Sequence, residues 1–177
     1  VERMLASGAR VTLWDRDAVA IDKAVSELRS HFTDATINSD VVDVVDHADV
    51  VRAAKTLAAT GIDIVVNSAF RGDTFQRVED ADMATWHKIF EVNFFGAMNL
   101  SRAAIPHLRA RGAGSIVNIA SMSARKVREA EAGYAASKAA LLTATQSMAL
   151  ELAPDRIRVN AVVPGWIWGP KIGRAHV

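Results

Sequence analysis

Two kinds of hydrophobic pattern alternate along this chain, short apolar runs and longer stretches in which apolar residues recur with helical spacing. The helical spacing predicts helices at 17–32, 46–59, 82–111 and 132–152. Short runs rich in β-branched residues lie between them and predict strands at 9–15, 35–39, 62–66, 115–120 and 157–163. Strands that alternate with helices form parallel sheets with helices on both faces. The pattern therefore predicts a doubly wound α/β domain.

Single residues mark how two of these helices begin or bend. Asp17 precedes the first helix and is predicted to be its N-cap, because a carboxylate accepts hydrogen bonds from the first backbone N–H groups. Pro106 lies inside the long helix 82–111 and is predicted to bend it, since proline removes one hydrogen bond of the helix.

Amino-acid composition excludes several classes of function and leaves the predicted fold unchanged. The 177 residues suit one domain, predicted at 1–170, and 21 basic against 20 acidic side chains leave a net charge of +1. This balance provides no field that would attract nucleic acid or an anionic membrane. The chain has no cysteine, and its five histidines are scattered without ligand spacing, so no metal site is expected. Without a signal peptide or an apolar run near 18 residues, we expect a cytoplasmic protein.

The chemistry centres on Ser121, Tyr134 and Lys138. Tyr134 and Lys138 are four residues apart, which places them one turn apart on the same helix face. An ammonium group there favours the phenolate form of the tyrosine. Ser121 follows a predicted strand, and its hydroxyl can hold a substrate oxygen, which predicts a proton-transfer site beside a carbonyl or alcohol. The alternative interpretation of this pattern is structural: a tyrosine at a packing interface and a lysine exposed to solvent, without a catalytic role.

This arrangement resembles the short-chain dehydrogenase/reductase family, in which a serine lies thirteen residues before Tyr-x-x-x-Lys. The resemblance implies a Rossmann-like fold and a nicotinamide-dependent oxidoreductase for a secondary alcohol or ketone. It implies that Tyr134 is the acid/base and that Lys138 also holds the nicotinamide ribose. Asn93 matches the family's Asn-x-x-Gly and is expected to hold a water that connects the lysine to solvent.

The predicted cofactor site lies at the ends of the strands, where ligands bind in open α/β sheets. Asp15 ends the first strand, and an acid there accepts hydrogen bonds from the ribose hydroxyls and repels a 2′-phosphate. We therefore expect NAD, and NADP only if Arg16 binds that phosphate instead. The Asp43-Val44 pair resembles the family's adenine-binding pair.

The remaining motifs follow the family's order along the chain. Asn67 is expected to bridge the backbone of neighbouring strands, and Ala69 to leave room for the cofactor ribose. Phe70 departs from the pattern, because it replaces a glycine and is expected to narrow the pocket. After the last strand, the resemblance implies three further cofactor contacts, the last through its backbone to the nicotinamide carboxamide: Pro164, Gly165 and Ile167.

Family members open with a strand and a glycine-rich turn that holds the pyrophosphate, and neither is found here. We expect an internal fragment, incomplete at both ends, whose sheet lacks a central strand and exposes two strand edges. Residues 171–177 have no periodicity and are predicted to be a non-native tail. The family also implies a homodimer or homotetramer through the helices 82–111 and 132–152. Two other functions stay open, an NAD-dependent epimerase or dehydratase and a non-catalytic Rossmann-fold binding module.

Overall fold

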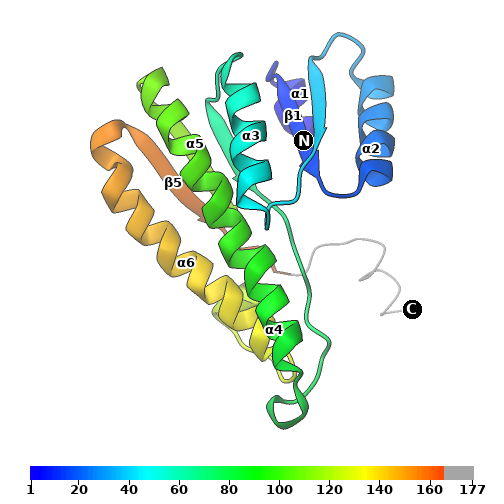
Figure 1. The fold of residues 1–177 in the computed structure, drawn as a ribbon, viewed down its shortest axis with the longest axis vertical. Helices are drawn as coiled ribbons and strands as arrows, with labels where there is room; N and C mark the ends of the chain where they lie inside the picture. Colours follow the sequence, from blue (N-terminus) through cyan, green and yellow to red (C-terminus); the bar gives the residue numbers. More distant parts are fainter. Residues whose placement is uncertain (166–177) are drawn as a thin grey trace.

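The computed structural model describes residues 1–165, in which parallel strands are covered by helices (Figure 1). The strands in this range are β1 (Val11–Asp15), β2 (Ile37–Val41), β3 (Ile64–Asn67), β4 (Gly114–Ile119) and β5 (Ile157–Val162). The α-helices are α1 (Glu2–Ala6), α2 (Ala18–His31), α3 (His47–Ala58), α4 (Met83–Phe90), α5 (Ala97–Arg111) and α6 (Ala132–Leu152). Shorter helical turns are η1 (Val78–Asp80), the π-helix η2 (Glu91–Gly96), η3 (Met122–Ala124) and η4 (Ala153–Asp155). The predicted alternation of strands and helices is confirmed.

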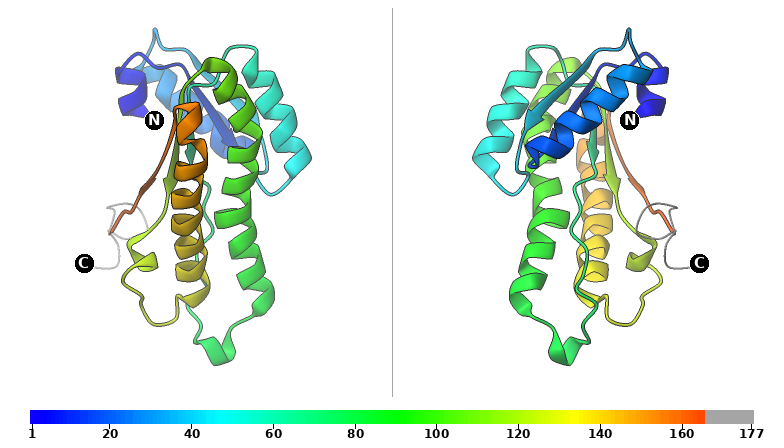
Figure 2. Two further views of the ribbon diagram at one scale, coloured as in Figure 1. Left: turned by 90° about the vertical axis from the view of Figure 1, so that its left-hand side faces the viewer. Right: turned by 90° about the vertical axis from the view of Figure 1, so that its right-hand side faces the viewer.

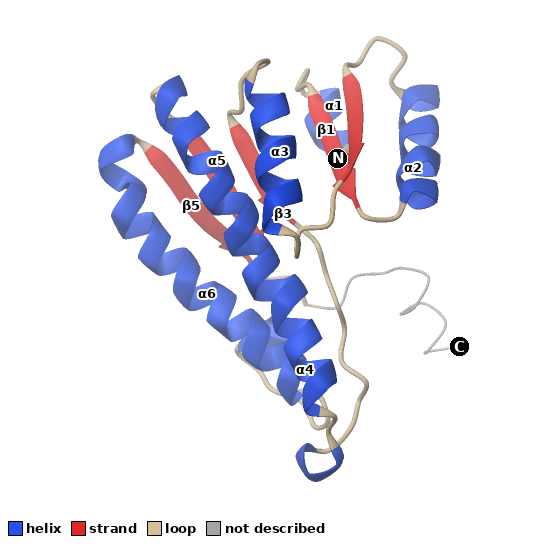
Figure 3. Cartoon of the chain, viewed as in Figure 1, coloured by secondary structure: helices blue, strands red, loops and turns tan. Residues whose placement is uncertain are grey.

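The strands pair in two groups, and every pairing is parallel. β1 pairs with β2, while β3, β4 and β5 form a second sheet in that order. Within residues 1–165 no ladder joins the two groups. Figure 3 shows that the strands of both groups point the same way, so their carboxyl ends lie along one edge of the molecule. Ligands bind at this edge in open parallel sheets.

Three small hydrophobic clusters hold these layers together. The largest joins α5 and α6 to the second sheet, and its members include Leu108, Ile116 and Ile157, which are almost fully buried. α2 packs on β1 and β2, whereas α3 packs on α5. Figure 2 shows α1 and α3 on opposite sides of the strands, as expected for helices that cover both faces.

Short-range capping fixes where three of the helices begin. The side chains of Asp17, Asp46 and Asp82 each accept hydrogen bonds from two backbone N–H groups of the following turn. Such a cap satisfies donors that have no partner inside the helix and contributes about 1 kcal/mol. The prediction that Asp17 is an N-cap is confirmed.

The predicted long helix 82–111 is divided into α4, η2 and α5. Pro106 lies inside α5, whereas the departure from α-helical geometry is the π-helix at Glu91–Gly96, which the sequence pattern did not indicate. π-helical turns occur often at functional sites. This one carries Asn93 and ends at Gly96, where a Cβ atom would lie 2.7 Å from Cγ2 of Val44. The helix can therefore approach the segment after β2 only with a glycine at this position.

Candidate active site

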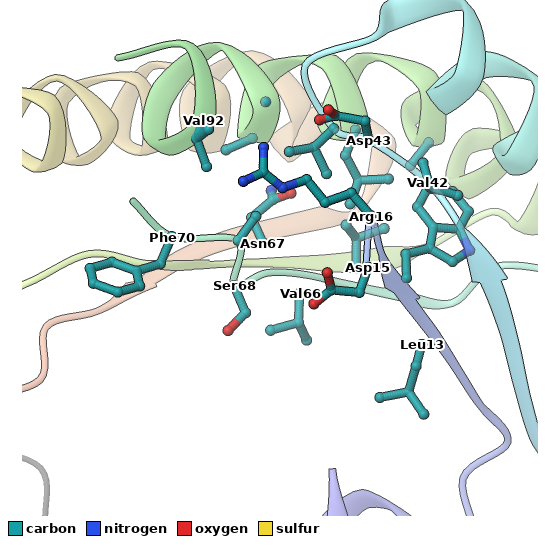
Figure 4. Close-up of a pocket in the computed structure, with 18 of the residues that line it drawn as sticks. Leu13, Asp15, Arg16, Val42, Asp43, Val66, Asn67, Ser68, Phe70 and Val92 are labelled. Atoms are coloured by element: carbon teal, nitrogen blue, oxygen red, sulfur yellow. The ribbon is translucent and has the colours of Figure 1, made fainter. Parts of the chain in front are cut away.

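A cavity of about 470 Å³ opens at the carboxyl ends of the strands (Figure 4). It extends between β1 and β3, and it is bounded by these strands, by the segments that follow β2 and β3, and by α3, η2, α5 and α6. The predicted site residues that line it are Asp15, Asp43, Val44, Asn67, Ala69, Asn93 and Lys138. These residues come from separate segments of the chain, and the fold brings them together around one space.

Tyr134 and Lys138 lie next to each other on the first turns of α6. The Lys138 ammonium is 6.0 Å from the centroid of the Tyr134 ring and donates a hydrogen bond of 2.7 Å to the carbonyl oxygen of Ile119. Only 3% of Lys138 is exposed, and this burial lowers its pKa to about 8. Desolvation disfavours a charge, so a cation kept in this position is held against an energetic cost.

Ser121 lies just beyond β4, at the start of η3. Its Oγ accepts a hydrogen bond of 3.1 Å from the backbone N–H of Ser123. Within residues 1–165 the Ser121 hydroxyl donates no hydrogen bond, so its proton remains available to an acceptor such as a carbonyl oxygen.

Asn93 is almost fully buried, and protein groups already occupy its amide. Its Oδ1 accepts a hydrogen bond from the backbone N–H of Arg71, and its Nδ2 donates to the Arg71 carbonyl and to Oγ of Ser137. The side chain thus ties the segment after β3 to α6. The amide oxygen keeps a second lone pair that could accept from a water, and the predicted water-holding role stays a prediction.

Asn67 is the last residue of β3 and belongs to a buried hydrogen-bond network that connects the sheet to α5 and α6. Its Nδ2 donates to Oδ1 of Asn118 at 2.7 Å and to Oγ of Ser101 at 3.0 Å. The expectation of a bridge to neighbouring backbone is therefore corrected, because the contact to β4 runs through the Asn118 side chain. The two asparagines are opposite each other in the β3–β4 register, which explains the pairing.

At the end of β1 the acidic group and a neighbouring cation both face the cavity. The Asp15 carboxylate accepts a hydrogen bond from the backbone N–H of Asp17, and in Figure 4 the Arg16 side chain extends across the opening beside it. On the neighbouring segment after β2, where the backbone N–H of Val42 donates to the Asp15 carbonyl, the Asp43 side chain accepts a hydrogen bond from the backbone N–H of Val45. The carbonyl of Val44 accepts from Nδ2 of Asn99 on α5.

The family model for short chain dehydrogenases matches residues 1–172. The chain belongs to this family. One relative is galactitol 2-dehydrogenase (L-tagatose-forming) of Cereibacter sphaeroides, which is 41% identical over 167 residues, or 92% of this chain and 63% of the relative. The chain thus spans somewhat less than two thirds of the length of this curated relative.

Two solved structures show the same fold. NAD⁺-bound xylitol dehydrogenase superposes with a TM-score of 0.92 at 30% identity, covering 98% of this chain and 67% of that one. The NADPH-bound short chain oxidoreductase from Pseudomonas aeruginosa PAO1 gives a TM-score of 0.92 at 28% identity, covering 98% and 68%. The Rossmann-like α/β fold predicted from the sequence is confirmed.

Phe70 departs from the short-chain dehydrogenase pattern and lies directly against the candidate acid/base. Its ring meets the Tyr134 ring edge to face, with centroids 5.9 Å apart and planes at 89°. Such pairs contribute about 0.5–1.5 kcal/mol beyond the area they bury. The side chain also lines the cavity and is 60% exposed, so Phe70 adjoins both the cavity and Tyr134.

The segment after β5 lies beside the candidate serine. The carbonyl of Pro164 accepts a hydrogen bond of 2.8 Å from the backbone N–H of Met122, which follows Ser121 directly. Pro164 therefore lies next to the segment that carries Ser121, and the cofactor contacts expected of Pro164 and Gly165 stay predictions. Ile167 lies outside the described residues.

Motif reasoning missed two buried groups that support the site. Glu131 is only 6% exposed, and it accepts hydrogen bonds from Ser123 and from Arg128, which fixes the segment between Ser121 and α6. Asn118 is fully buried and links Asn67 to Thr145 on α6. Asn118 could have been found from the sequence, because it is a polar residue at an inward position of a predicted strand. No pattern in the sequence marks Glu131.

Two negative findings apply to the described part of the chain. Residues 1–165 contain no group of three or more histidine, aspartate or glutamate side chains placed to hold a metal ion. In the same range no helix has both the length and the apolar character needed to cross a membrane.

Proposed function

We propose that this chain forms the cofactor-binding and catalytic part of an NAD(P)-dependent oxidoreductase that acts on a secondary alcohol or ketone. The observation that carries the proposal is the buried Lys138 ammonium 6.0 Å from the Tyr134 ring, at the margin of the cavity. A single short-chain dehydrogenase motif in the sequence is weak support. A lysine held beside the only tyrosine, at the strand ends where dinucleotides bind, is specific support.

The cavity suits a dinucleotide in its chemistry. Carboxylates at Asp15 and Asp43 can accept hydrogen bonds from hydroxyl and amino groups, and Lys138 can donate to ribose hydroxyls. When bound, the nicotinamide ring supplies or accepts the hydride. Every proton movement is then left to the side chains of this chain.

In the reducing direction Ser121 donates its hydroxyl hydrogen to the substrate carbonyl oxygen and holds it beside Tyr134. The Tyr134 hydroxyl delivers its proton to that oxygen, which is general acid catalysis. The Lys138 ammonium stabilises the phenolate that remains, since a nearby cation favours the charged form. Asn93 holds the Arg71 segment and α6 in register, which keeps these groups in place.

The direct test is to purify the complete gene product and follow absorbance of NADH while it is offered alcohols, polyols and hydroxysteroids with NAD. Net formation of free NADH supports an oxidoreductase. An epimerase or dehydratase would convert its substrate while the total of free NADH stays constant. No turnover and no cofactor binding would favour the non-catalytic module.

We expect NAD rather than NADP, with Asp15 as the determinant. Substitution of Asp15 by alanine removes both a ribose acceptor and the repulsion of a 2′-phosphate, so the ratio of kcat/KM for NAD to that for NADP should fall by about 10-fold. Asp82→Ala is the matched control, because Asp82 caps α4 through its carboxylate and is not among the residues that line the cavity. A parent enzyme that already prefers NADP would assign the choice to Arg16.

We also propose that the complete gene product is a homodimer or homotetramer. α6 carries the small residues Ala136, Ala139 and Ala140, and Leu150 near its end is 80% exposed. Small side chains allow two helices to approach closely, and burial of an exposed leucine at a subunit interface stabilises the assembly through the hydrophobic effect. Light scattering should give a mass of at least two subunits, and a monomer at all concentrations would contradict the proposal. The cytoplasmic location stays a prediction from the sequence.

A further inference from the structure

We infer that Asp73 is a positioning residue for Tyr134, acting through the backbone of the tyrosine. This inference rests on the proposed function of Tyr134 as the acid/base. Asp73 lies in the loop between β3 and η1, 61 residues before Tyr134, and its Oδ2 accepts a hydrogen bond of 2.9 Å from the Tyr134 backbone N–H. No sequence motif singled it out.

The start of α6 needs such a partner. The first N–H groups of a helix have no acceptor within it, and the residue at the N-cap position, Glu131, makes no side-chain capping bond. Its carboxylate is instead engaged by Ser123 and Arg128. Asp73 therefore takes over the capping of α6 from a distant loop. A carboxylate at a helix N-terminus is also favoured by the helix dipole.

The loop that carries Asp73 is itself fixed. Both backbone groups of Arg71 are bonded to the Asn93 amide, at 2.8 and 2.9 Å. The Asp73 Oδ1 accepts a further bond of 2.8 Å from the backbone N–H of Thr74. The carboxylate that meets Tyr134 thus belongs to a segment anchored on the π-helix.

The same network returns to the tyrosine from the other side. Ser137 donates its hydroxyl to the Tyr134 carbonyl at 2.7 Å and accepts from the Asn93 amide at 3.0 Å. The N–H of Tyr134 is therefore held by Asp73 and its carbonyl by Ser137, and both holders are tied through Asn93. Phe70, three residues before Asp73, contacts the tyrosine ring. Together these hydrogen bonds and the ring contact fix the position of the Tyr134 phenol relative to the cavity.

The kinetic test uses two substitutions in the complete gene product. Asp73→Ala should lower kcat by about 10-fold, because a displaced acid/base loses its reactive geometry, while KM for cofactor and substrate changes less than about twofold. Asp73→Asn should restore kcat to within about twofold of the parent, since an amide oxygen accepts the same N–H. Asp82→Ala is the control, because it removes a carboxylate cap from α4 without touching Tyr134. An equal loss of kcat in this control would reduce the effect to general destabilisation.

A second readout does not depend on turnover. Tyr134 is the only tyrosine of the 177 residues, and after ¹⁵N-tyrosine labelling of the complete gene product its amide signal is the one that Tyr134→Phe removes. Hydrogen exchange at this amide should be about tenfold faster in Asp73→Ala, the effect of losing one hydrogen bond, and unchanged in Asp73→Asn. Unchanged exchange in Asp73→Ala overturns the inference, as does fast exchange in Asp73→Asn.

The two readouts also separate this inference from the proposed function. If Asp73→Ala does not fold, Asp73→Asn alone decides, because loss of slow exchange or of kcat in that variant contradicts the role of the side-chain oxygen. If the gene product has no dehydrogenase activity, the proposed function fails while the amide exchange still tests the contact between Asp73 and Tyr134.

Discussion

Tyr134→Phe is expected to lower kcat by a factor on the order of 10²–10⁴, the usual effect of losing a general acid or base. Phenylalanine keeps the aromatic ring, so the edge contact with Phe70 and the packing of α6 remain, and only the hydroxyl is lost. No other tyrosine within the 177 residues can take its place. Steady-state kinetics on the complete gene product are the measurement.

Cofactor binding is the control for this prediction. NAD affinity measured by calorimetry should change little in Tyr134→Phe, because the main cofactor contacts proposed here are made by other side chains. A variant that binds the cofactor but does not turn over places the defect in proton transfer. Near-normal turnover would falsify the role of Tyr134 as the acid/base.

Lys138→Met should reduce activity and raise stability at the same time. The methionine side chain is of similar length but carries no charge, so the phenolate loses its cation and kcat should fall by about 10²–10³, as when one electrostatic donor is removed. Because burial lowers the pKa of Lys138 from 10.5 to about 8, the folded state binds the proton more weakly than the unfolded chain. The charged lysine therefore destabilises the folded protein.

The pH dependence follows from the sign of this shift. Below pH 8 Lys138 is protonated in both the folded and the unfolded protein. The full free-energy cost of burying its charge then lowers the stability of the folded state, by at most about 3 kcal/mol for a pKa shift of this size. As the pH rises from about 8 to 10.5, the folded protein releases the proton first, and the cost disappears. The lost hydrogen bond to Ile119 offsets about 1 kcal/mol of the gain in the variant.

Urea unfolding of the complete gene product at pH 7 and at pH 10 measures this difference. Lys138→Met should exceed the parent in free energy of unfolding by roughly 1–2 kcal/mol at pH 7, the difference of the two contributions above, and the advantage should be lost at pH 10. Lys55→Met, at an exposed position of α3, is the control and should show no such trend. An advantage that grows with pH would contradict the burial of a charged lysine.

The sequence by itself determined those features that depend on neighbours along the chain. Helices and strands follow from hydrophobic periodicity, and the cap at Asp17 follows from contacts within three residues. Tyr134 and Lys138 share a helix face for the same reason, because a spacing of four residues fixes their relative direction whatever surrounds the helix. The strand-end location of Asp15 and Asn67 required only the order of the elements.

Only the tertiary structure decided the contacts between distant segments. The pairing of Asn67 with Asn118 depends on the register of two strands, and the capping of α6 at Tyr134 by Asp73 depends on a loop that passes the N-terminal end of α6. The π-helix at 91–96 and the burial of Lys138 arise from packing against other elements, which periodicity does not encode. Local patterns fix directions along one element, whereas distances between elements are fixed by the packing of the whole chain. The chemical groups were therefore predictable from the sequence, and the network that positions them was not.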